Sequence, residues 1–391
     1  MKKVIVSHPG RQHSHQLAYA LQEGKILLKY FTGLWYKPDK FPYSILKKMP
    51  QLEKEFKKRY FEKINPEYVV QNPFPEIKYR FILKDKNPWL KIGMEFDRWV
   101  SKKLKKLDFD IFIGYELSSL KSFRIAKLKK KITILDLSQI HYKDIIKINN
   151  KFKFLNVNKR VLKIENKIKD EELKYADYII VLSEFAKESL IKNGIDRDRI
   201  FVAHLGIEPS IFKPTERHED KEFTLIFVGT ICKRKGINYL IETYKRINKP
   251  DIHLTIIGPP ADAFKYIEKN IKNLKYKSFL PHEKLVKEYY KSSIFVFPSL
   301  LDSFAQVVLE AMACGLPVII TENVGAKDCV RNGVDGFIIP PGDITALKEK
   351  ILYFYYNREK IYEMGKNASE QARKYTWEKY RENILKFIKE L

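Results

Sequence analysis

The sequence has few of the features that mark disulfide-linked, zinc-binding or membrane-spanning proteins. Its three cysteines, Cys232, Cys314 and Cys329, show no paired or C-x-x-C spacing, which argues against a disulfide framework or a zinc site and fits a reducing compartment. It contains no run of about 20 apolar residues, so no helix is expected to span a membrane. The apolar run Val4–Ser7 is broken at Pro9 and is too short for a signal peptide. We therefore expect a cytoplasmic protein.

Acidic residues are scarce relative to basic ones. The chain has 74 Lys and Arg residues against 48 Asp and Glu, a net charge of +26, and residues 1–160 alone carry 36 basic and 15 acidic residues, or +21. An anionic lipid surface, a nucleic acid or an acidic glycan would each suit such an excess. Because lysines are scattered along the whole chain, a well-solvated surface explains it equally well. No recognisable nucleic-acid-binding module is present, so we expect no nucleic acid among the partners.

The length and the hydrophobic pattern predict two α/β domains. A chain of 391 residues with 45% hydrophobic residues is long for one core. Short β-branched apolar runs alternate with longer amphipathic stretches, which is typical of parallel sheets with crossover helices. The strands expected are Val4–Ser7, Ile26–Phe31, Asp110–Gly114, Ile132–Leu137, Tyr178–Leu182, Phe201–Ala203, Phe223–Val228, His253–Ile257, Ile294–Phe297, Pro317–Ile320 and Phe337–Ile339.

Three further segments complete this plan. Gly206–His218 is rich in proline and charge and is expected to link the domains, and Thr376–Leu391 reads as an amphipathic helix. We therefore predict domains at 1–212 and 213–375 and a C-terminal helix at 376–391. Lys47–Lys63 mixes basic and aromatic residues, a pattern that lies at membrane interfaces in other proteins. Leu90–Leu107 is expected to be a helix whose C-terminal lysines face solvent and the helix dipole.

The most informative segment is Phe297–Thr321, FPSLLDSFAQVVLEAMACGLPVIIT. We expect a strand ending at Pro298, a loop with Asp302, a helix from about Phe304 to Ala313, and a second strand. A helix N-terminus that follows a parallel strand presents free N–H groups and a positive dipole end, and so suits a diphosphate. Glu310 falls about two turns into the helix, where an acidic residue beside a nucleotide commonly holds the ribose hydroxyls.

This run resembles the acidic signature of the retaining GT-B glycosyltransferases of family GT4, in which two glutamates are separated by seven residues. The resemblance implies that Glu310 binds the donor ribose and that Asp302 contacts the transferred sugar, although Asp is one methylene shorter than the usual Glu. Ala305 stands where the family usually has Gly. The backbone amides of Phe304, Ala305 and Gln306 would then hold the phosphates. The implied fold is α/β, GT-B, with two Rossmann-like domains facing across a cleft and the C-terminal helix returning to the N-terminal domain.

A second segment, Phe227–Gly236 (FVGTICKRKG), resembles the glycine-flanked loop of the same family. Lys235 matches the lysine that neutralises the donor diphosphate, next to Gly229. Thr230 stands where the family often has Arg, so one phosphate contact is absent or replaced. Arg234 is a candidate for that contact, because a guanidinium binds phosphate through two parallel hydrogen bonds. A solvated Lys-Arg-Lys run is the simpler alternative.

The loop after the first expected strand, His8–Gln16 (HPGRQHSHQ), resembles the family's N-terminal loop. Gly10 matches the glycine that lets the backbone approach the donor phosphate and the acceptor. Arg11, His13 and His15 are candidates for acceptor or phosphate contacts. We expect the three histidines to lack a supporting carboxylate nearby, and the family class needs no metal, so we expect neither a metal site nor a cofactor.

Weaker matches extend the resemblance over nearly the whole chain. His141, in ILDLSQIHY, matches a histidine near the transferred sugar, although a buried structural histidine would give the same pattern. Gly258 follows a strand near the nucleotide, and Leu280 lies in a loop, FLPHEKL, whose backbone would read the base.

The resemblance implies transfer of a sugar, with retention and without metal, from a nucleotide sugar to a glycan, lipid-linked or other hydroxyl acceptor. The departing phosphate would act as the base. The enzyme is a candidate for peripheral association with the inner face of the cell membrane. Three alternatives stay open: another GT-B enzyme such as a sugar-nucleotide epimerase or a phosphorylase, a basic nucleic-acid-binding protein, and an inactive protein that keeps the fold.

Overall fold

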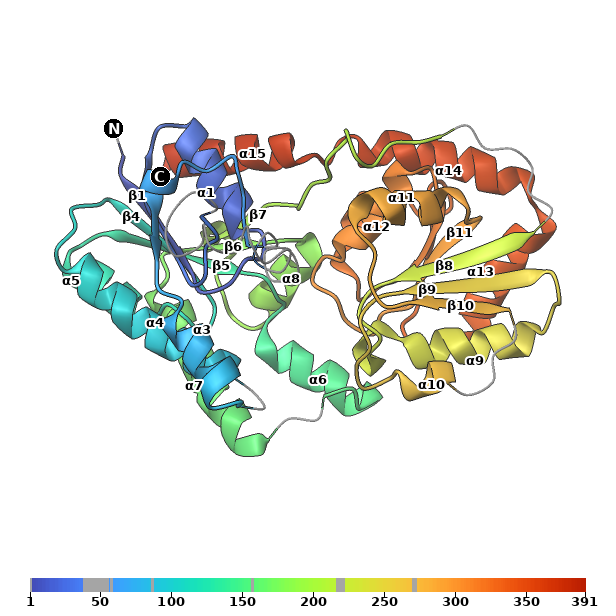
Figure 1. Cartoon of the computed structure of the whole chain (residues 1–391), viewed down its shortest axis with the longest axis horizontal. Helices are drawn as coiled ribbons and strands as arrows, with labels where there is room; N and C mark the ends of the chain where they lie inside the picture. Colours follow the sequence, from blue (N-terminus) through green and yellow to red (C-terminus); the bar gives the residue numbers. More distant parts are fainter. Residues whose placement is uncertain are drawn as a thin grey trace, which may run out of the picture.

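Two parallel sheets lie side by side, each covered by helices (Figure 1). The computed structural model describes residues 2–37, 56, 59–85, 88–155, 158–215, 222–268 and 273–391. Most of the basic and aromatic segment Lys47–Lys63 lies outside these residues, so its predicted interfacial role is not addressed by the structure. The architecture is the two-domain α/β arrangement that the sequence predicts.

The N-terminal sheet has seven strands in the order β3-β2-β1-β4-β5-β6-β7, and all neighbouring pairs are parallel. Its strands are β1 (Val4–His8), β2 (Leu27–Thr32), β3 (Val69–Gln71), β4 (Ile111–Tyr115), β5 (Ile132–Leu137), β6 (Tyr178–Val181) and β7 (Ile200–Val202). The helices of this half are α1 (Ser14–Glu23), α3 (Phe74–Ile77), α4 (Trp89–Leu104), α5 (Leu120–Leu128), α6 (Tyr142–Phe152), α7 (Lys159–Tyr175) and α8 (Glu184–Lys192), with a π-helical turn, η3 (Lys78–Ile82), after α3.

The C-terminal sheet has six parallel strands in the order β10-β9-β8-β11-β12-β13. They are β8 (Phe223–Val228), β9 (Ile252–Ile257), β10 (Leu274–Lys277), β11 (Ile294–Phe297), β12 (Val318–Thr321) and β13 (Gly336–Ile339). The helices of this half and of the C-terminal tail are α9 (Ile237–Ile247), α10 (Lys265–Glu268), α11 (His282–Tyr290), α12 (Gln306–Ala313), α13 (Ile344–Tyr356), α14 (Glu359–Ala372) and α15 (Trp377–Glu390), with the short 3-10 turns η5 (Lys233–Lys235) and η6 (Gly325–Cys329). Two further 3-10 turns, η2 (Pro66–Tyr68) and η4 (Arg197–Arg199), belong to the N-terminal half.

The central strands follow directly from the apolar runs of the sequence. β8 and β11 have the predicted bounds, and both are almost wholly buried because helices cover the two faces of the sheet. The sequence analysis missed β3 and β10, the outer strands of their sheets. β3 has only three residues, and β10, Leu-Lys-Tyr-Lys, is partly exposed. Neither carries the continuous apolar run by which a central strand is predicted.

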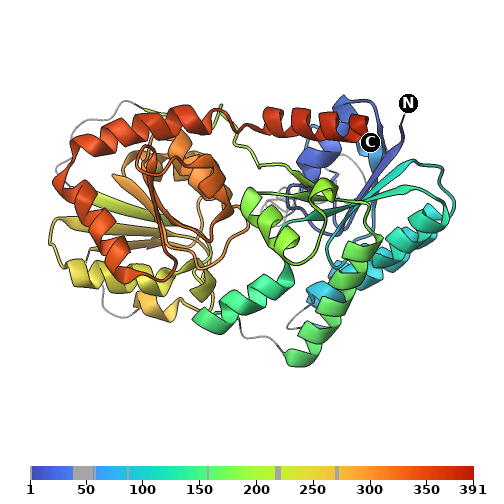
Figure 2. The ribbon, with the colours of Figure 1, turned by 180° about the vertical axis from the view of Figure 1, so that it is seen from behind.

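Two segments cross between the domains, and they are hydrogen bonded to each other. The N–H of Ile207 donates to the carbonyl of Tyr375 at 3.0 Å, and the N–H of Trp377 donates to the carbonyl of Ile207 at 3.1 Å. A Cβ atom on Gly206 would lie 2.1 Å from the carbonyl carbon of Thr376, so the close pairing needs glycine there. The domains are therefore joined by a paired connection rather than by one free linker (Figure 2).

After this crossing, α15 lies along α1 of the N-terminal domain (Figure 1). Arg381 pairs with Glu23 at 2.7 Å, and the rings of Phe387 and Phe201 stack at 4.3 Å. The predicted return of the C-terminal helix to the N-terminal domain is thus observed.

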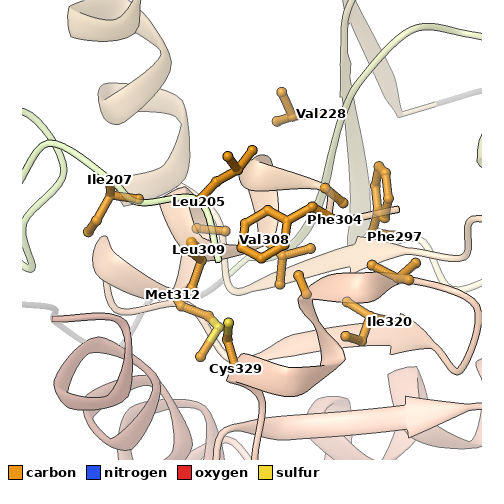
Figure 3. Packing of buried hydrophobic residues seen from close by; sticks show 14 of the residues in the cluster. Leu205, Ile207, Val228, Phe297, Phe304, Val308, Leu309, Met312, Ile320 and Cys329 are labelled. Carbon is orange, nitrogen blue, oxygen red and sulfur yellow. The ribbon is translucent and has the colours of Figure 1, made fainter. Parts of the chain in front are cut away.

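The core continues from the C-terminal sheet into the connection. Val308, Leu309 and Met312 of α12 are buried, as are Leu205 and Ile207 of the first crossing segment. Figure 3 shows these side chains packed together. Helix α12 is therefore fixed on one side by its own sheet and on the other by the segment that links the domains.

Candidate active site

A cleft of about 610 Å³ separates the two domains, and residues of both line it. The loops after β1 and β5 reach it from the N-terminal side, and the loops after β8 and β11 reach it from the C-terminal side. Crevices at the carboxyl ends of parallel strands are where open α/β sheets bind ligands. Of the residues predicted from the sequence, the cleft brings together Arg11, His13, His15, Arg234, Asp302 and Gln306.

Arg234 and Lys235 lie in the turn η5, directly after β8. The ammonium of Lys235 pairs with the carboxylate of Asp302. Nη1 of Arg234 donates to the carbonyl of Leu301 at 2.8 Å. The two loops that the sequence analysis treated as separate signals are therefore held together by their own charged side chains.

The start of α12 differs from the prediction. The helix begins at Gln306 rather than at Phe304, because Ala305 has a left-handed backbone with φ of 66°. The N–H of Phe304 donates to the carboxylate of Asp302 at 3.2 Å, so of the three amides proposed for phosphate this one is already engaged. Nε2 of Gln306 donates to the carbonyl of Gly206 at 3.0 Å, linking the helix start to the domain connection.

Glu310 lies farther along α12, and its side chain is buried. Burial raises the pKa of its carboxyl group to about 7, and a hydrogen bond from the Tyr289 hydroxyl, at 3.5 Å, opposes that rise. A buried carboxyl group with a raised pKa is a candidate for a functional site. The described residues place it beside the cleft rather than in its lining.

Gly229 and Gly258 follow β8 and β9, so their backbones meet at the carboxyl edge of the sheet. A Cβ atom on Gly258 would lie 1.9 Å from the carbonyl oxygen of Gly229, which leaves no room for a side chain. Thr230 is exposed next to them, and Leu280 packs partly buried against the core. The absence of a side chain at residue 258 thus lets the two loops pack against each other at this edge of the sheet.

On the N-terminal side, His13 is held in a buried contact with Asp136. Its Nε2 lies 2.9 Å from both carboxylate oxygens of Asp136, and both side chains are almost fully buried. The expectation that no carboxylate supports the histidines was therefore wrong, because β5 brings Asp136 from a distant part of the sequence. Gly10 donates its N–H to Nδ1 of His8 at 3.0 Å, and burial lowers the pKa of His8 to about 4.

His141 lies at the start of α6, just outside the cleft lining. Its Nδ1 accepts a hydrogen bond from the N–H of Lys143 at 3.2 Å, so the imidazole caps the helix. Its ring stacks on Tyr142 at 4.7 Å. Burial lowers the pKa of His141, so the ring is a neutral group near neutral pH.

No group of three or more His, Cys, Asp or Glu side chains that could hold a metal ion occurs in the described part of the chain. The contact of His13 with Asp136 joins one imidazole to one carboxylate. Among the described residues, the charged groups that line the cleft from the C-terminal domain are Arg234 and Asp302, and Asp302 pairs with Lys235.

Two family models match adjoining parts of the chain. The model described as Glycosyltransferase Family 4 matches residues 18–211, and the model described as Glycosyl transferases group 1 matches residues 210–374. The chain belongs to this glycosyltransferase family. It is therefore assigned to enzymes that transfer glycosyl groups, and the boundary between the models falls in the first crossing segment.

Curated relatives of this glycosyltransferase carry several activities in their names. An uncharacterised glycosyltransferase, MJ1178 of Methanocaldococcus jannaschii, is 30% identical over 68% of this chain and 71% of its own length. A probable sucrose-phosphate synthase of Thermosipho melanesiensis is 28% identical over 55% of each chain. The capsular polysaccharide biosynthesis glycosyltransferase CapM of Staphylococcus aureus is 30% identical over 54% of this chain and 59% of its own. The chain thus spans little more than half the length of the latter two.

Solved structures show the same fold across the full glycosyltransferase chain. A sucrose-phosphate synthase from Thermosynechococcus elongatus superposes with a TM-score of 0.72 at 16% identity, covering 100% of this chain and 99% of the other. Anabaena Alr3699/HepE in complex with UDP superposes with a TM-score of 0.68 at 15% identity, covering 100% of both. These likenesses establish the GT-B fold.

The glycosyltransferase cleft also contains residues that the sequence analysis did not assign to it. His282 and Trp377 line it, although the loop before His282 and the tail that begins at Trp377 were recognised as family segments. Ser303 lines it too, and its hydroxyl donates to the carbonyl of Ser138 across the domain boundary at 2.5 Å. The relative placement of the domains shows that these three side chains line the cleft, which the local sequence patterns did not indicate.

Proposed function

We propose that this protein is a retaining, metal-independent glycosyltransferase that moves a sugar from a nucleoside diphosphate sugar to a hydroxyl group. The observation that carries the proposal is the gathering of Arg234, Lys235, Asp302 and the start of α12 at one edge of the C-terminal sheet. Positive side chains and helix N–H groups at one point suit a diphosphate. The UDP and UDP-glucose complexes of the HepE neighbour make a uridine nucleotide the first donor to try.

The donor would lie along the C-terminal face of the cleft. Glu310 would accept hydrogen bonds from the ribose hydroxyls. The nucleoside would lie near the edge formed by Gly229 and Gly258, and the backbone of the loop at Leu280 would contact the base. Lys235 would exchange its contact with Asp302 for the diphosphate. Asp302 is then released to bind a hydroxyl of the transferred sugar.

The chemical step would rest on charge rather than on a covalent intermediate. Departure of the nucleoside diphosphate places negative charge on its terminal phosphate, which Lys235, Arg234 and the amides of Ala305 and Gln306 would stabilise. The sugar carbon becomes oxocarbenium-like as its bond to the phosphate oxygen breaks. Among the described residues that line the cleft, Asp302 is the only residue with a carboxylate, and this carboxylate forms an ion pair with Lys235. We therefore favour attack from the face that the phosphate leaves, with that phosphate taking the acceptor proton.

The acceptor would bind against the N-terminal domain, at Arg11, His13 and His15. His141, at the rim, would contact the transferred sugar. A glycan or lipid-linked hydroxyl is the acceptor class we propose, in keeping with the capsular polysaccharide relative. Closure of the domains would exclude water and so suppress hydrolysis of the donor.

The donor assignment is tested by Lys235→Ala and Glu310→Ala. Each should abolish release of nucleoside diphosphate in the presence of acceptor while the protein stays folded by circular dichroism. Lys233→Ala is the matched control, since it removes a neighbouring lysine of the same run, whereas Lys235 is the lysine that pairs with Asp302. Full activity in both the Lys235 and the Glu310 variant would contradict the proposed donor site. Products of epimerisation or phosphorolysis, without transfer, would favour the other GT-B enzymes.

The described residues contain no helix long and apolar enough to cross a membrane. Association with an anionic membrane surface is nevertheless part of the proposal. Large apolar side chains are unusually exposed around η3 and the start of α4, led by Phe81 at 68%, Ile82 at 64% and Leu83 at 58%. The guanidinium of Arg80 lies over the ring of Trp89 at 4.1 Å. Aromatic and basic side chains together are typical of interfacial binding.

The membrane proposal is tested by sedimentation with liposomes. Wild type should bind vesicles containing phosphatidylglycerol more strongly than neutral vesicles, and a triple change of Phe81, Ile82 and Leu83 to Ser should remove most of that binding. Leu128→Ser is the control, because Leu128 is 80% exposed but lies near the other end of α4, where the neighbouring Lys129 donates to the carbonyl of Leu104 at 3.2 Å. Equal, weak binding to both vesicle types would remove the membrane from the proposal. A gel shift that persists at physiological salt would instead support nucleic-acid binding.

A further inference from the structure

The N-terminal domain contacts the loop that carries Asp302 through two hydrogen bonds, and both involve Ser303. The hydroxyl of Ser183, directly before α8, donates to the carbonyl oxygen of Ser303 at 2.7 Å. The hydroxyl of Ser303 donates to the carbonyl oxygen of Ser138, directly after β5, at 2.5 Å. Ser303 is therefore held from the opposite domain both at its backbone and at its side chain.

The backbone on either side of Ser303 is held by the C-terminal domain itself. The carbonyl of Asp302 accepts a hydrogen bond from the N–H of Gly325 at 2.8 Å. The carbonyl of Phe304 accepts one from the N–H of Ala326 at 2.7 Å. Both donors belong to η6, so the loop is fixed to its own domain before and after the residue that the N-terminal domain holds.

The peptide group between Ser303 and Phe304 connects the opposite domain to the carboxylate of Asp302. Its carbonyl oxygen accepts from the Ser183 hydroxyl, and its N–H donates to Oδ1 of Asp302 at 3.2 Å. Because a peptide group is planar, turning its carbonyl away from Ser183 also turns its N–H away from the carboxylate. Oδ2 of the same carboxylate pairs with Lys235. The orientation of Asp302 therefore depends on a contact with the N-terminal domain.

The Ser183 side chain is itself firmly placed. It is fully buried, and its oxygen also accepts a hydrogen bond from the N–H of Ala186 at 3.2 Å, as the N-terminal cap of α8. The N–H of Glu184 donates to Oδ2 of Asp328 at 2.6 Å, again across the domain boundary. The start of α8 is thus docked on the C-terminal domain at two neighbouring residues, and it gives the Ser303 carbonyl a fixed partner.

We propose that Ser183 and Ser303 are positioning residues, which orient the carboxylate of Asp302 toward the transferred sugar when the two domains are docked. Lys235 and Arg234 belong to the C-terminal domain, so binding of the diphosphate should not depend on this contact. Separation of the domains would leave the nucleotide bound and its sugar loosely held. This inference rests on the proposed glycosyl transfer for the role of Asp302, and it adds that the N-terminal domain completes the sugar half of the donor site.

Hydrogen exchange tests the contact without ligand or activity. In Ser183→Ala the amide of Phe304 should exchange about fivefold faster than in wild type, because its peptide loses the hydrogen bond that fixes the carbonyl. Ser303→Ala should act in the same direction, and Ser303→Thr, which keeps the hydroxyl, should restore the wild-type rate. Asp343→Ala removes the same kind of helix cap from α13 and should leave the rate unchanged. Wild-type exchange in both alanine variants, at 183 and at 303, would overturn the inference.

Calorimetric titration with UDP and with UDP-glucose separates positioning of the sugar from damage to the whole site. Ser183→Ala and Ser303→Ala should weaken UDP-glucose binding about fivefold and change UDP binding less than about twofold, because the altered contact serves the sugar. Equal weakening of both ligands would overturn the inference. If wild type does not bind UDP, or binds UDP-glucose no more tightly than UDP, the proposed donor is wrong, and exchange at Phe304 alone then decides whether the contact orients the loop.

Discussion

The hydroxyl of Tyr289, on α11, donates a 3.5 Å hydrogen bond to the carboxylate of Glu310, on α12, and both side chains are buried. Burial raises the pKa of Glu310 from 4.5 to about 7. The folded state therefore holds a proton more tightly than the unfolded state, and stability falls as the pH rises between these two values. At pH 8 the loss is about 3 kcal/mol, because each pKa unit corresponds to about 1.4 kcal/mol.

The change Glu310→Gln should remove this loss, since the amide stays neutral. We expect the variant to be more stable than wild type by about 2–3 kcal/mol at pH 8 and nearly equal to it at pH 5. Urea denaturation at both pH values measures the difference. Glu322→Gln, at an exposed position, should leave stability unchanged at both. A variant less stable than wild type at pH 8 would show that the native carboxylate is stabilised by its surroundings.

Ala305 stands in a left-handed conformation with φ of 66°, which costs an L-residue about 1–2 kcal/mol. Ala305→Gly should raise the free energy of unfolding by up to about 1 kcal/mol, part of the gain being offset by the lost methyl group and by a more flexible unfolded chain. Ala311→Gly, inside α12, should lower it by about 1 kcal/mol. Chemical denaturation compares the two, and destabilisation of equal size at both sites would contradict the prediction.

Gly206→Val should disrupt the paired connection between the domains, because a Cβ atom there would lie 2.1 Å from the Thr376 carbonyl carbon. We expect a loss of more than about 2 kcal/mol in stability. Limited proteolysis should also cut the chain near the crossing segments sooner than in wild type. Gly333→Asn is the control, since no atom lies within 4 Å of a Cβ there and Asn tolerates its positive φ of 79°. Equal protease resistance in both variants would argue against the pairing.

Thr230→Arg should strengthen nucleotide binding. Thr230 is exposed beside Gly229, where the family often has Arg, and Arg234 already donates to the carbonyl of Leu301. A new guanidinium within reach of the diphosphate should increase affinity for UDP about fivefold and make it more sensitive to salt. Calorimetric titration at two potassium chloride concentrations measures both effects. Thr230→Gln, which lengthens the side chain without charge, should show neither.

Local sequence patterns predicted the central strands, whose bounds depend on their own apolar runs. β8 and β11 have the expected bounds because their apolar runs are flanked by polar residues or by proline and glycine. β10 was missed because a partly exposed edge strand can carry lysine at alternate positions, as Leu-Lys-Tyr-Lys does, and so lacks a continuous apolar run. The start of α12 was placed two residues early because nothing in the sequence showed that Ala305 is left-handed.

In the candidate site, too, single residues were predicted from local motifs, whereas the contacts between them were not. Lys235 and Asp302 were both named from their own motifs, but their mutual contact depends on two strands that are neighbours in the sheet and distant in the sequence. The support that Asp136 gives to His13 likewise comes from another strand. His282 and Trp377 line the cleft only because the domains face each other and α15 returns. Such contacts follow from topology, which short motifs do not encode.

The paired crossing segments also set how the cleft can open. A single crossing segment would let one domain rotate relative to the other about several axes. Two crossing segments joined by the hydrogen bonds at Ile207 should resist twisting of the domains, so we expect the domains to move mainly by bending toward or away from each other. The bond from Gln306 to Gly206 attaches the start of α12 to this same joint. Bending there shifts the proposed phosphate-binding helix end relative to Arg11. The joint between the domains and the proposed donor site are thus connected through this one hydrogen bond, and we expect donor binding to change the angle between the domains.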